Sequence, residues 1–180
     1  MKTDIHEEII IPERVQVHSD ETFVVKGPRG EIKKKMRDPA VKLVVGDGKV
    51  SLDSARATKN EKKKVYTFVA HIKNMFRGVL QGYFYELKVC AAHFPINVTV
   101  AGKELIVKNF LGESAPRKLL LREGVNVKVN GDIIRIESPD KELAGMTSSE
   151  IELLTKIRNR DRRVFQDGIF IIRKGVIESR

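Results

Sequence analysis

Cys90 and His93 are residues whose types and spacing could do catalytic or metal chemistry. Because they stand three positions apart, they could act as a nucleophile with its base or as two ligands of a metal ion. The chain has one cysteine, and its other histidines show no ligand spacing that would complete a tetrahedral site. We therefore expect no catalytic residues, no metal site and no cofactor, and we interpret this pair as structural.

A phosphate-binding loop is also missing from the sequence. Residues 45–49 contain two glycines, but they lack the spacing of such a loop and the helix that must follow it. The carboxylates alternate with Lys and Arg along polar stretches and do not form a convergent catalytic set. An RNA-modifying enzyme, or any enzyme with a small-molecule substrate, is therefore the least favoured class of function.

Positive charge is the main chemical property of the chain. Its 180 residues include 34 Lys and Arg against 24 Asp and Glu, which gives a net charge of +10 and a pI of about 9.7. A chain this basic attracts polyanions, and the phosphate backbone of nucleic acid is the commonest of them. Because the sequence has no Trp and few aromatic residues, a platform that stacks single-stranded bases is disfavoured. The shape and phosphates of a folded RNA fit better, with an anionic membrane surface or an acidic protein as alternatives.

The basic residues are most concentrated near the C-terminus. Residues 156–180 contain 8 basic and 3 acidic side chains, and four polar residues recur there at steps of three and four: Lys156, Asn159, Arg160 and Arg163. This spacing predicts one basic face of a helix, opposite its apolar stripe. A face of one sign favours contact with phosphates, and the alternative is a solvated helix surface.

A second basic cluster lies in the first half of the chain, at residues 26–37 and 62–64. Lys residues at a strand edge or at the start of a helix often protect the edge and keep the surface solvated. We interpret this cluster in that way, and we place the main RNA contact in the second half.

The two halves of the chain share a repeated pattern. Residues 23–31 and, about eighty positions later, residues 105–113 each contain an apolar strand, a Lys, a turn and then Gly-Glu. Gly30 and Gly112 suit a backbone that turns with positive φ. The tip of the turn differs, since Gly-Pro-Arg in the first copy is Asn-Phe-Leu in the second. We therefore expect two duplicated domains, residues 1–82 and 83–180, whose second copy has acquired a separate task.

Each half has the pattern of antiparallel strands followed by a helix, so the predicted fold class is α+β. Five strands are expected in the first half, at residues 8–17, 23–26, 31–37, 41–45 and 49–52. The helix begins at Thr58, whose capping box with Glu61 satisfies free N–H groups, and it ends near Gly82.

In the second half, six strands are expected before the helix, at residues 83–92, 96–100, 105–107, 117–122, 125–129 and 133–137. A second capping box, Thr147 with Glu150, predicts the start of a helix that continues into the basic segment. A last strand follows from residue 167. Each domain is thus expected to be an antiparallel sheet packed against one helix.

Several features indicate the compartment. No apolar run approaches the roughly 18 residues that a membrane span needs, and the N-terminal residues lack the apolar core of a signal peptide. A single cysteine excludes a disulfide within the chain, which is typical of a reducing compartment. We expect a cytoplasmic protein with no membrane partner.

Four strings in order, at residues 25–30, 92–98, 109–113 and 158–175, are similar to one family over the whole length of the chain. The sequence resembles protein six of the large ribosomal subunit, in the archaeal and eukaryotic branch where the eukaryotic form is called number nine; its uninterrupted length looks archaeal. The resemblance implies two duplicated α+β domains and a structural constituent of the ribosome in the cytoplasm. It implies that the second domain binds large-subunit rRNA near the sarcin-ricin loop and the translation-factor-binding region, beside neighbouring large-subunit ribosomal proteins.

The resemblance also implies which residues face RNA. These RNA-binding candidates are His93, Asn109, Gly112, Arg117, Lys118, Lys156, Arg158, Asn159, Arg160, Arg162, Arg163, Arg173 and Lys174. The sequence departs from the family pattern at Arg162, Val164 and Gln166. The alternative function is a basic protein-interaction adaptor that retains RNA incidentally.

Overall fold

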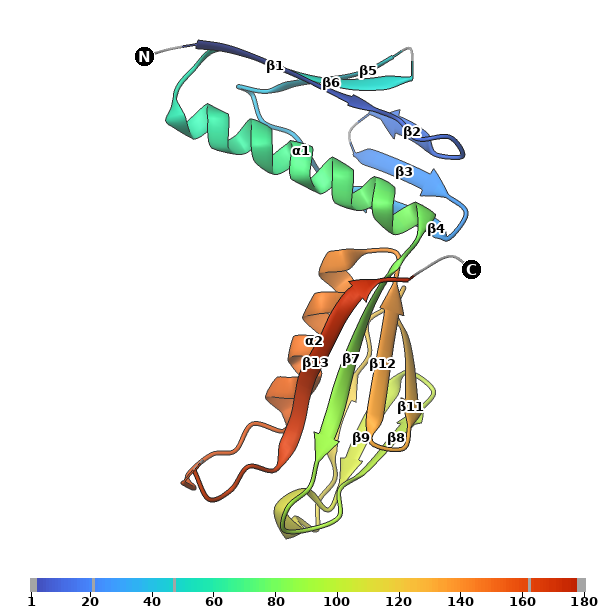
Figure 1. Ribbon diagram of the computed structural model, residues 1–180, viewed down its shortest axis with the longest axis vertical. Coiled ribbons are helices and arrows are strands. Elements are labelled where there is room, and N and C mark those ends of the chain that lie inside the picture. Colours follow the sequence, from blue (N-terminus) through green and yellow to red (C-terminus); the bar gives the residue numbers. More distant parts are fainter. Residues whose placement is uncertain (1–2, 21, 47, 162, 178–180) are drawn as a thin grey trace. The chain divides into compact units, whose positions relative to one another are not determined.

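Antiparallel strands packed against helices form both halves of the chain. The computed structural model describes residues 3–20, 22–46, 48–161 and 163–177, and the chain divides into two units, Met1–Gly82 and Tyr83–Arg180 (Figure 1). All strand pairs in the described residues are antiparallel. Each unit buries one long helix against its own sheets, which confirms the predicted α+β fold class with a duplicated domain.

The first unit has two three-stranded sheets, ordered β1-β6-β5 and β2-β3-β4, and one helix that packs on strands of both (Figure 1). Its elements are β1 (Thr3–Ile10), β2 (Gln16–Ser19), β3 (Phe23–Gly27), β4 (Gly30–Lys34), β5 (Lys42–Gly46), β6 (Lys49–Ala57) and α1 (Lys59–Leu80). The expectation of five strands before the helix is wrong. Pro12 and the turn after it separate β1 from β2, and β1 begins earlier because its polar residues face outward, where His6 bonds Asp53 on β6.

The capping box of α1 is present as predicted. The Thr58 N–H donates to Oε2 of Glu61 at 2.8 Å, and the Thr58 hydroxyl oxygen accepts from the Asn60 N–H. The helix ends before Gly82, whose φ of +80° is the left-handed conformation expected there. Its apolar face is buried from Val65 onward, with Val65, Val69, Ile72, Met75, Phe76 and Val79 in the core.

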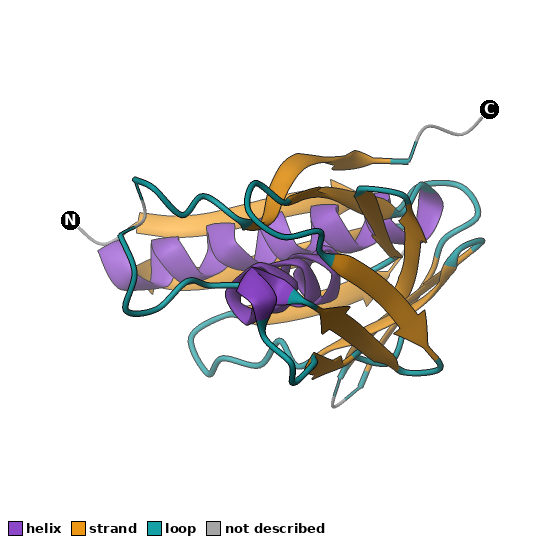
Figure 2. Cartoon of the chain, turned by 90° about the horizontal axis from the view of Figure 1, so that it is seen from below, coloured by secondary structure: helices purple, strands orange, loops and turns teal. Residues whose placement is uncertain are grey.

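The second unit repeats this order and adds one strand. Its elements are β7 (Tyr83–Cys90), β8 (Asn97–Ala101), β9 (Glu104–Lys108), the short 3₁₀ helix η1 (Phe110–Gly112), β10 (Arg117–Leu120), β11 (Asn126–Asn130), β12 (Ile133–Ser138), α2 (Lys141–Leu154) and β13 (Gly168–Val176). They form a three-stranded sheet, β10-β9-β8, and a four-stranded sheet, β11-β12-β7-β13. Helix α2 packs on the four-stranded sheet, and Figure 2 shows this helix nearly end-on.

The predicted start of α2 is wrong. The helix begins at Lys141, and Asp140 is its N-cap because its Oδ1 accepts the Glu142 N–H at 2.8 Å. Thr147 is completely buried inside the helix, so it forms no capping box with Glu150. The buried face of the first turns consists of Ala144, Thr147 and Ser148, and such small or polar residues give no hydrophobic periodicity for a sequence pattern to detect.

The predicted basic helical face is also wrong, because α2 ends at Leu154. Thr155 closes the helix: its hydroxyl donates to the Glu152 carbonyl and accepts from the Ile169 N–H at 2.9 Å. Asn159 has a φ of +57°, which is incompatible with a continuing helix. Residues 156–167 therefore form a loop that joins α2 to β13. Neither α1 nor α2, among the described residues, is long and apolar enough to cross a membrane.

Replacing Gly27 by Ala should destabilise the first unit by about 1–3 kcal/mol, because overpacking a closed contact costs this much. A Cβ at Gly27 would stand 2.8 Å from Cβ of Val79 and 3.0 Å from its carbonyl oxygen. Gly46→Ala is the matched control, since that position also ends a strand and has nothing within 4 Å. Thermal unfolding measures both variants, and equal effects would contradict the close packing of β3 on α1.

Candidate nucleic-acid interface

Three segments of the second unit meet at one end of its sheets. They are residues 91–96 after β7, residues 109–116 between β9 and β10, and residues 155–167 between α2 and β13 (Figure 1, lower end). We call these segments together the tip, and residues 156–163 the basic loop. The tip contains most of the residues that the sequence predicts to face RNA.

The buried carboxylate of Asp167 joins two segments of the tip. Its Oδ1 accepts the backbone N–H groups of Ala92 and His93 at 2.6 and 3.0 Å, and its Oδ2 accepts from Nδ1 of His93 at 2.5 Å. Burial by itself raises the pKa of Asp167, since its side chain is 1% exposed, but these bonds outweigh burial and hold the pKa below its usual value. The carboxylate therefore stays ionised and fixes the His93 ring.

His93 also belongs to an aromatic stack. Its ring lies on that of Phe165, with centroids 4.7 Å apart and an angle of 28° between the planes. The guanidinium of Arg160 lies over the same Phe165 ring at 4.8 Å from the centroid. Phe165 thus orients His93 and Arg160, which come from two of the three segments, although the sequence pattern assigned no role to Phe165 or Asp167.

Arg117 is held within the protein by three of its nitrogens. Nε and Nη2 donate to the Glu113 carboxylate at 2.9 and 2.6 Å, and Nη1 donates to the carbonyl of Leu154 at 2.6 Å. Its guanidinium also lies 4.3 Å from the centroid of the Phe110 ring. Arg117 therefore ties the turn after β9 to the C-terminus of α2, where a cation is favourable. An RNA contact by Arg117 stays a prediction.

The turn after β9 needs an unusual backbone. Asn109, Leu111 and Gly112 have φ values of +59°, +52° and +77°. The Asn109 side-chain amide donates to the Pro95 carbonyl at 3.0 Å, and the ring of Phe94 packs over Gly112. In the first unit, Gly27 and Gly30 instead pair directly in a tight hairpin between β3 and β4. The rebuilt turn is thus fastened to residues 91–96.

The basic loop is anchored at both ends, by Thr155 before it and Asp167 after it. Arg163 pairs with Asp161 at 2.8 Å, whereas Lys156 and Arg158 form no ion pair with any described residue. Arg162 lies outside the described residues. The loop therefore presents cations to solvent from a fixed base.

Besides Arg117 at the start of β10, three predicted residues lie outside the tip. Arg173 and Lys174 are on β13 opposite Glu86 and Tyr85, about 17 and about 20 Å along the strand from Gly168 at about 3.3 Å per residue. Lys118 is on β10, where its Nζ lies 3.8 Å from the Glu104 carboxylate. The structure does not bring these side chains together with the basic loop.

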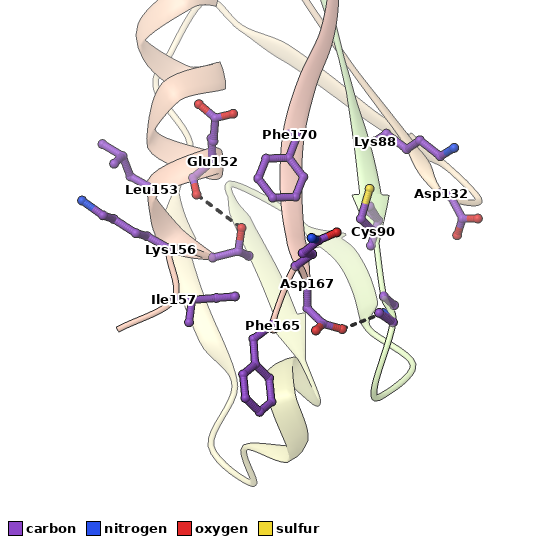
Figure 3. A pocket seen from close by; sticks show the side chains of 15 residues that line it. Lys88, Cys90, Asp132, Glu152, Leu153, Lys156, Ile157, Phe165, Asp167 and Phe170 are labelled. Carbon is purple, nitrogen blue, oxygen red and sulfur yellow. Dashed lines mark hydrogen bonds between the residues drawn. The ribbon is translucent and has the colours of Figure 1, made fainter. Parts of the chain in front are cut away.

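An open groove of about 1090 Å³ lies beside the tip, between the ends of β7 and α2 and the start of β13 (Figure 3). Its lining combines cations, Lys88 and Lys156, with carboxylates, Asp132 and Glu152. No cluster of His, Cys, Asp and Glu in the described residues could hold a metal ion. Cys90 lines the groove, while the Nδ1 of His93 is occupied by Asp167, so the two do not form a nucleophile and base through that nitrogen.

Comparison with known proteins gives consistent matches over the chain. A family model described as Ribosomal protein L6 matches residues 11–82 and again residues 94–168, once in each unit. The large ribosomal subunit protein uL6 of Sulfurisphaera tokodaii is 41% identical over 177 residues, covering 97% of this chain and 95% of that protein. The uL6 of Methanococcus vannielii is 41% identical over 171 residues, with 94% of each chain covered. The uL6 of Nanoarchaeum equitans is 45% identical over 176 residues, covering 93% and 92%.

Replacing Asp167 by Asn should lower the free energy of unfolding by about 1–3 kcal/mol at neutral pH, because the His93 ring loses its charged partner. Because the pKa of Asp167 is lowered in the folded protein, its carboxylate stabilises the fold at pH values above the ordinary pKa of an aspartate. This stabilisation is lost as the pH falls through the lowered pKa. The difference in free energy of unfolding between the wild type and Asp167→Asn should therefore become smaller on acidification. Urea unfolding at pH values from neutral to about 3 measures this difference. Asp161→Asn, in the exposed part of the same loop, is the control and should change stability much less than Asp167→Asn.

Proposed function

The chain belongs to the ribosomal protein L6 family, and on that premise we propose that the tip of its second unit holds the protein on large-subunit rRNA. Proteins of this family are structural constituents of the large ribosomal subunit and not enzymes. The partners of this chain are accordingly ribosomal RNA and other ribosomal proteins.

The observation that carries the proposal is the difference in pairing between two sets of cations. In the first unit, Lys26 and Lys33 both pair with Glu31, and Lys64 pairs with Asp38 at 2.6 Å. In the basic loop, Lys156 and Arg158 have no ion pair among the described residues. A phosphate that approaches the basic loop displaces no ion-pair partner of these two side chains from the described part of the chain, which favours the second unit as the main RNA-binding domain.

The way the loop is built supports the same surface. Ordering a flexible loop on binding costs conformational entropy, and the anchors at Thr155 and Asp167 have already fixed its ends. Phosphate contacts then set the position and orientation of the protein, while the shape of the folded RNA supplies selectivity. Gly112 has the positive φ that this turn requires, and the Phe94 ring packs over it; His93 is 33% exposed while its Nδ1 is held.

We further propose that the bound rRNA lies near the sarcin-ricin loop and the translation-factor-binding region. This location on the rRNA is supported by the similarity of residues 92–98 and 158–163 to the family motifs. The second unit is the half that would face it, since both motifs lie in the tip.

Lys156→Ala with Arg158→Ala should weaken binding of the full chain to a large-subunit rRNA transcript more than Lys33→Ala with Lys49→Ala. Both pairs of changes lower the net charge from +10 to +8, so bulk charge is matched. With about six phosphate contacts, wild-type affinity should fall by roughly 10³ between about 50 and 200 mM salt. The salt dependence of the Lys156→Ala, Arg158→Ala variant should be shallower, by an amount that corresponds to about two fewer phosphate contacts. Filter binding over a salt series measures this.

The opposite ranking would place the main contact on the first unit. A wild-type affinity that does not change with salt would remove the electrostatic account. Tighter binding to an acidic protein than to the transcript would favour the adaptor function.

The address is tested by cleavage from a tethered probe. Val164 is 60% exposed in the tip, so Val164→Cys in a Cys90→Ser background gives one attachment point for an iron chelate. Hydroxyl radicals generated in reconstituted large subunits should cut the rRNA at the sarcin-ricin loop. Cuts confined to other regions would contradict the address, and the same probe at Val44→Cys in the first unit, 56% exposed, is the control.

A further inference from the structure

Phe94 is a large aromatic side chain that the tip leaves half exposed. It is 46% exposed, although the neighbouring aromatic ring of Phe110 is 1% exposed. Three atoms at the edge of the Phe94 ring lie 3.5–3.6 Å from the position that a Cβ on Gly112 would take. The ring therefore rests on the turn after β9, while nearly half of the Phe94 surface stays open to solvent.

The backbone on both sides of Phe94 is fixed. The N–H groups of Ala92 and His93 are bound by the Asp167 carboxylate, and the Pro95 carbonyl accepts from the Asn109 side chain. Pro95 also has a restricted φ, which limits the conformations of the residue before it. The ring is thus held in place before any ligand arrives, so binding to it costs little entropy.

Two residues next to Phe94, one in space and one in sequence, interact with groups that contact cations. Gly112, which supports the ring, precedes Glu113; Arg117 donates to the Glu113 carboxylate and lowers its pKa, and the charge of Arg160 lowers that pKa further. His93, the residue before Phe94, stacks on Phe165, and the guanidinium of Arg160 lies over the Phe165 ring. An exposed apolar ring in the same tip as the cations of the basic loop matches the two parts of a nucleotide, a flat base and an anionic phosphate.

We propose, on the basis of the RNA-binding function proposed above, that Phe94 is the stacking site for one unpaired nucleobase of the bound rRNA. The base is one that leaves the stack of its own helix, at a bulge or a loop, and lies on the open part of the ring. Its flanking phosphates are held by the basic loop. Every nucleobase has a π face, so this contact recognises an unstacked nucleotide and not a sequence.

A single stacked base does not require a platform. The chain has 6% aromatic residues and no Trp, which disfavours stacking of successive bases along a strand. One ring in a fixed position is enough to select a site in a folded RNA where a base is already extruded. Phosphate contacts alone do not make this distinction, since every nucleotide has a phosphate.

The test compares Phe94→Leu with Phe94→Tyr in the full chain, using a large-subunit rRNA transcript over a salt series. Leu keeps an apolar side chain but has no ring, whereas Tyr keeps the ring. Phe94→Leu should weaken binding about 5- to 150-fold at every salt concentration, which is the usual effect of losing one stacked base. The salt slope should stay parallel to that of the wild type, since no phosphate contact is lost, and Phe94→Tyr should bind within about threefold of the wild type.

Five results would overturn the inference, and each has its own reading. If the wild-type chain itself does not bind the transcript, the proposed function fails and the stacking site fails with it. If the wild type binds with a steep salt slope and Phe94→Leu binds equally well, only the stacking site fails. If Phe94→Tyr loses as much affinity for RNA as Phe94→Leu, the ring does not act by stacking on a base. If the melting temperature of Phe94→Leu falls along with its affinity, the ring supports the fold and not a base. If Phe94→Leu binds RNA normally but is incorporated poorly into large subunits, the ring contacts a protein neighbour.

Discussion

The buried carboxylate of Asp167 is the interaction on which the candidate interface depends. A carboxylate that is 1% exposed is tolerated only because three donors, two of them backbone N–H groups, satisfy it. The bonds connect the end of the basic loop to residues 91–96, two segments far apart in the sequence. This charge orients His93 together with the Phe165 ring, fixes the backbone before Phe94 together with the Asn109–Pro95 bond, and anchors the end of the basic loop whose start Thr155 anchors.

Duplication supplied two similar scaffolds, and the second was changed at its end. In the first unit the turn after β3 is a tight hairpin closed by Gly27 and Gly30, and nearby lysines are paired with acidic residues. In the second unit the corresponding turn contains η1, and its Asn109 side chain donates to the Pro95 carbonyl. Arg117 connects this turn to α2 by donating to the Leu154 carbonyl. The strand β13 also completes a fourth position in the sheet beside β7. Lys26 and Lys33 beside the first turn are therefore paired, whereas Lys156 and Arg158 in the tip form no ion pair among the described residues.

Sequence patterns predicted the elements that have strong local signals. The strands from β3 to β13 lie within a few residues of their predicted positions, and α1 has its predicted capping box because Thr58 and Glu61 are neighbours on the first turn. Predictions for α2 failed at both ends. Its early buried face has Ala144 and Ser148 in place of large apolar residues, and the spacing of Lys156, Asn159 and Arg160 imitates a helix that Thr155 has already closed.

The sequence by itself determined the net positive charge, the duplicated domains of the α+β class and the family, because these follow from composition and from motifs that are read along the chain. The tertiary structure decided which cations are available. It placed Arg117 in an internal network, left Lys156 and Arg158 without ion pairs among the described residues, and joined Asp167 to His93 across 74 positions. Periodic patterns report neighbours within one or two turns of chain, whereas the partner of a charge is set by how distant segments pack, so only the folded chain shows it.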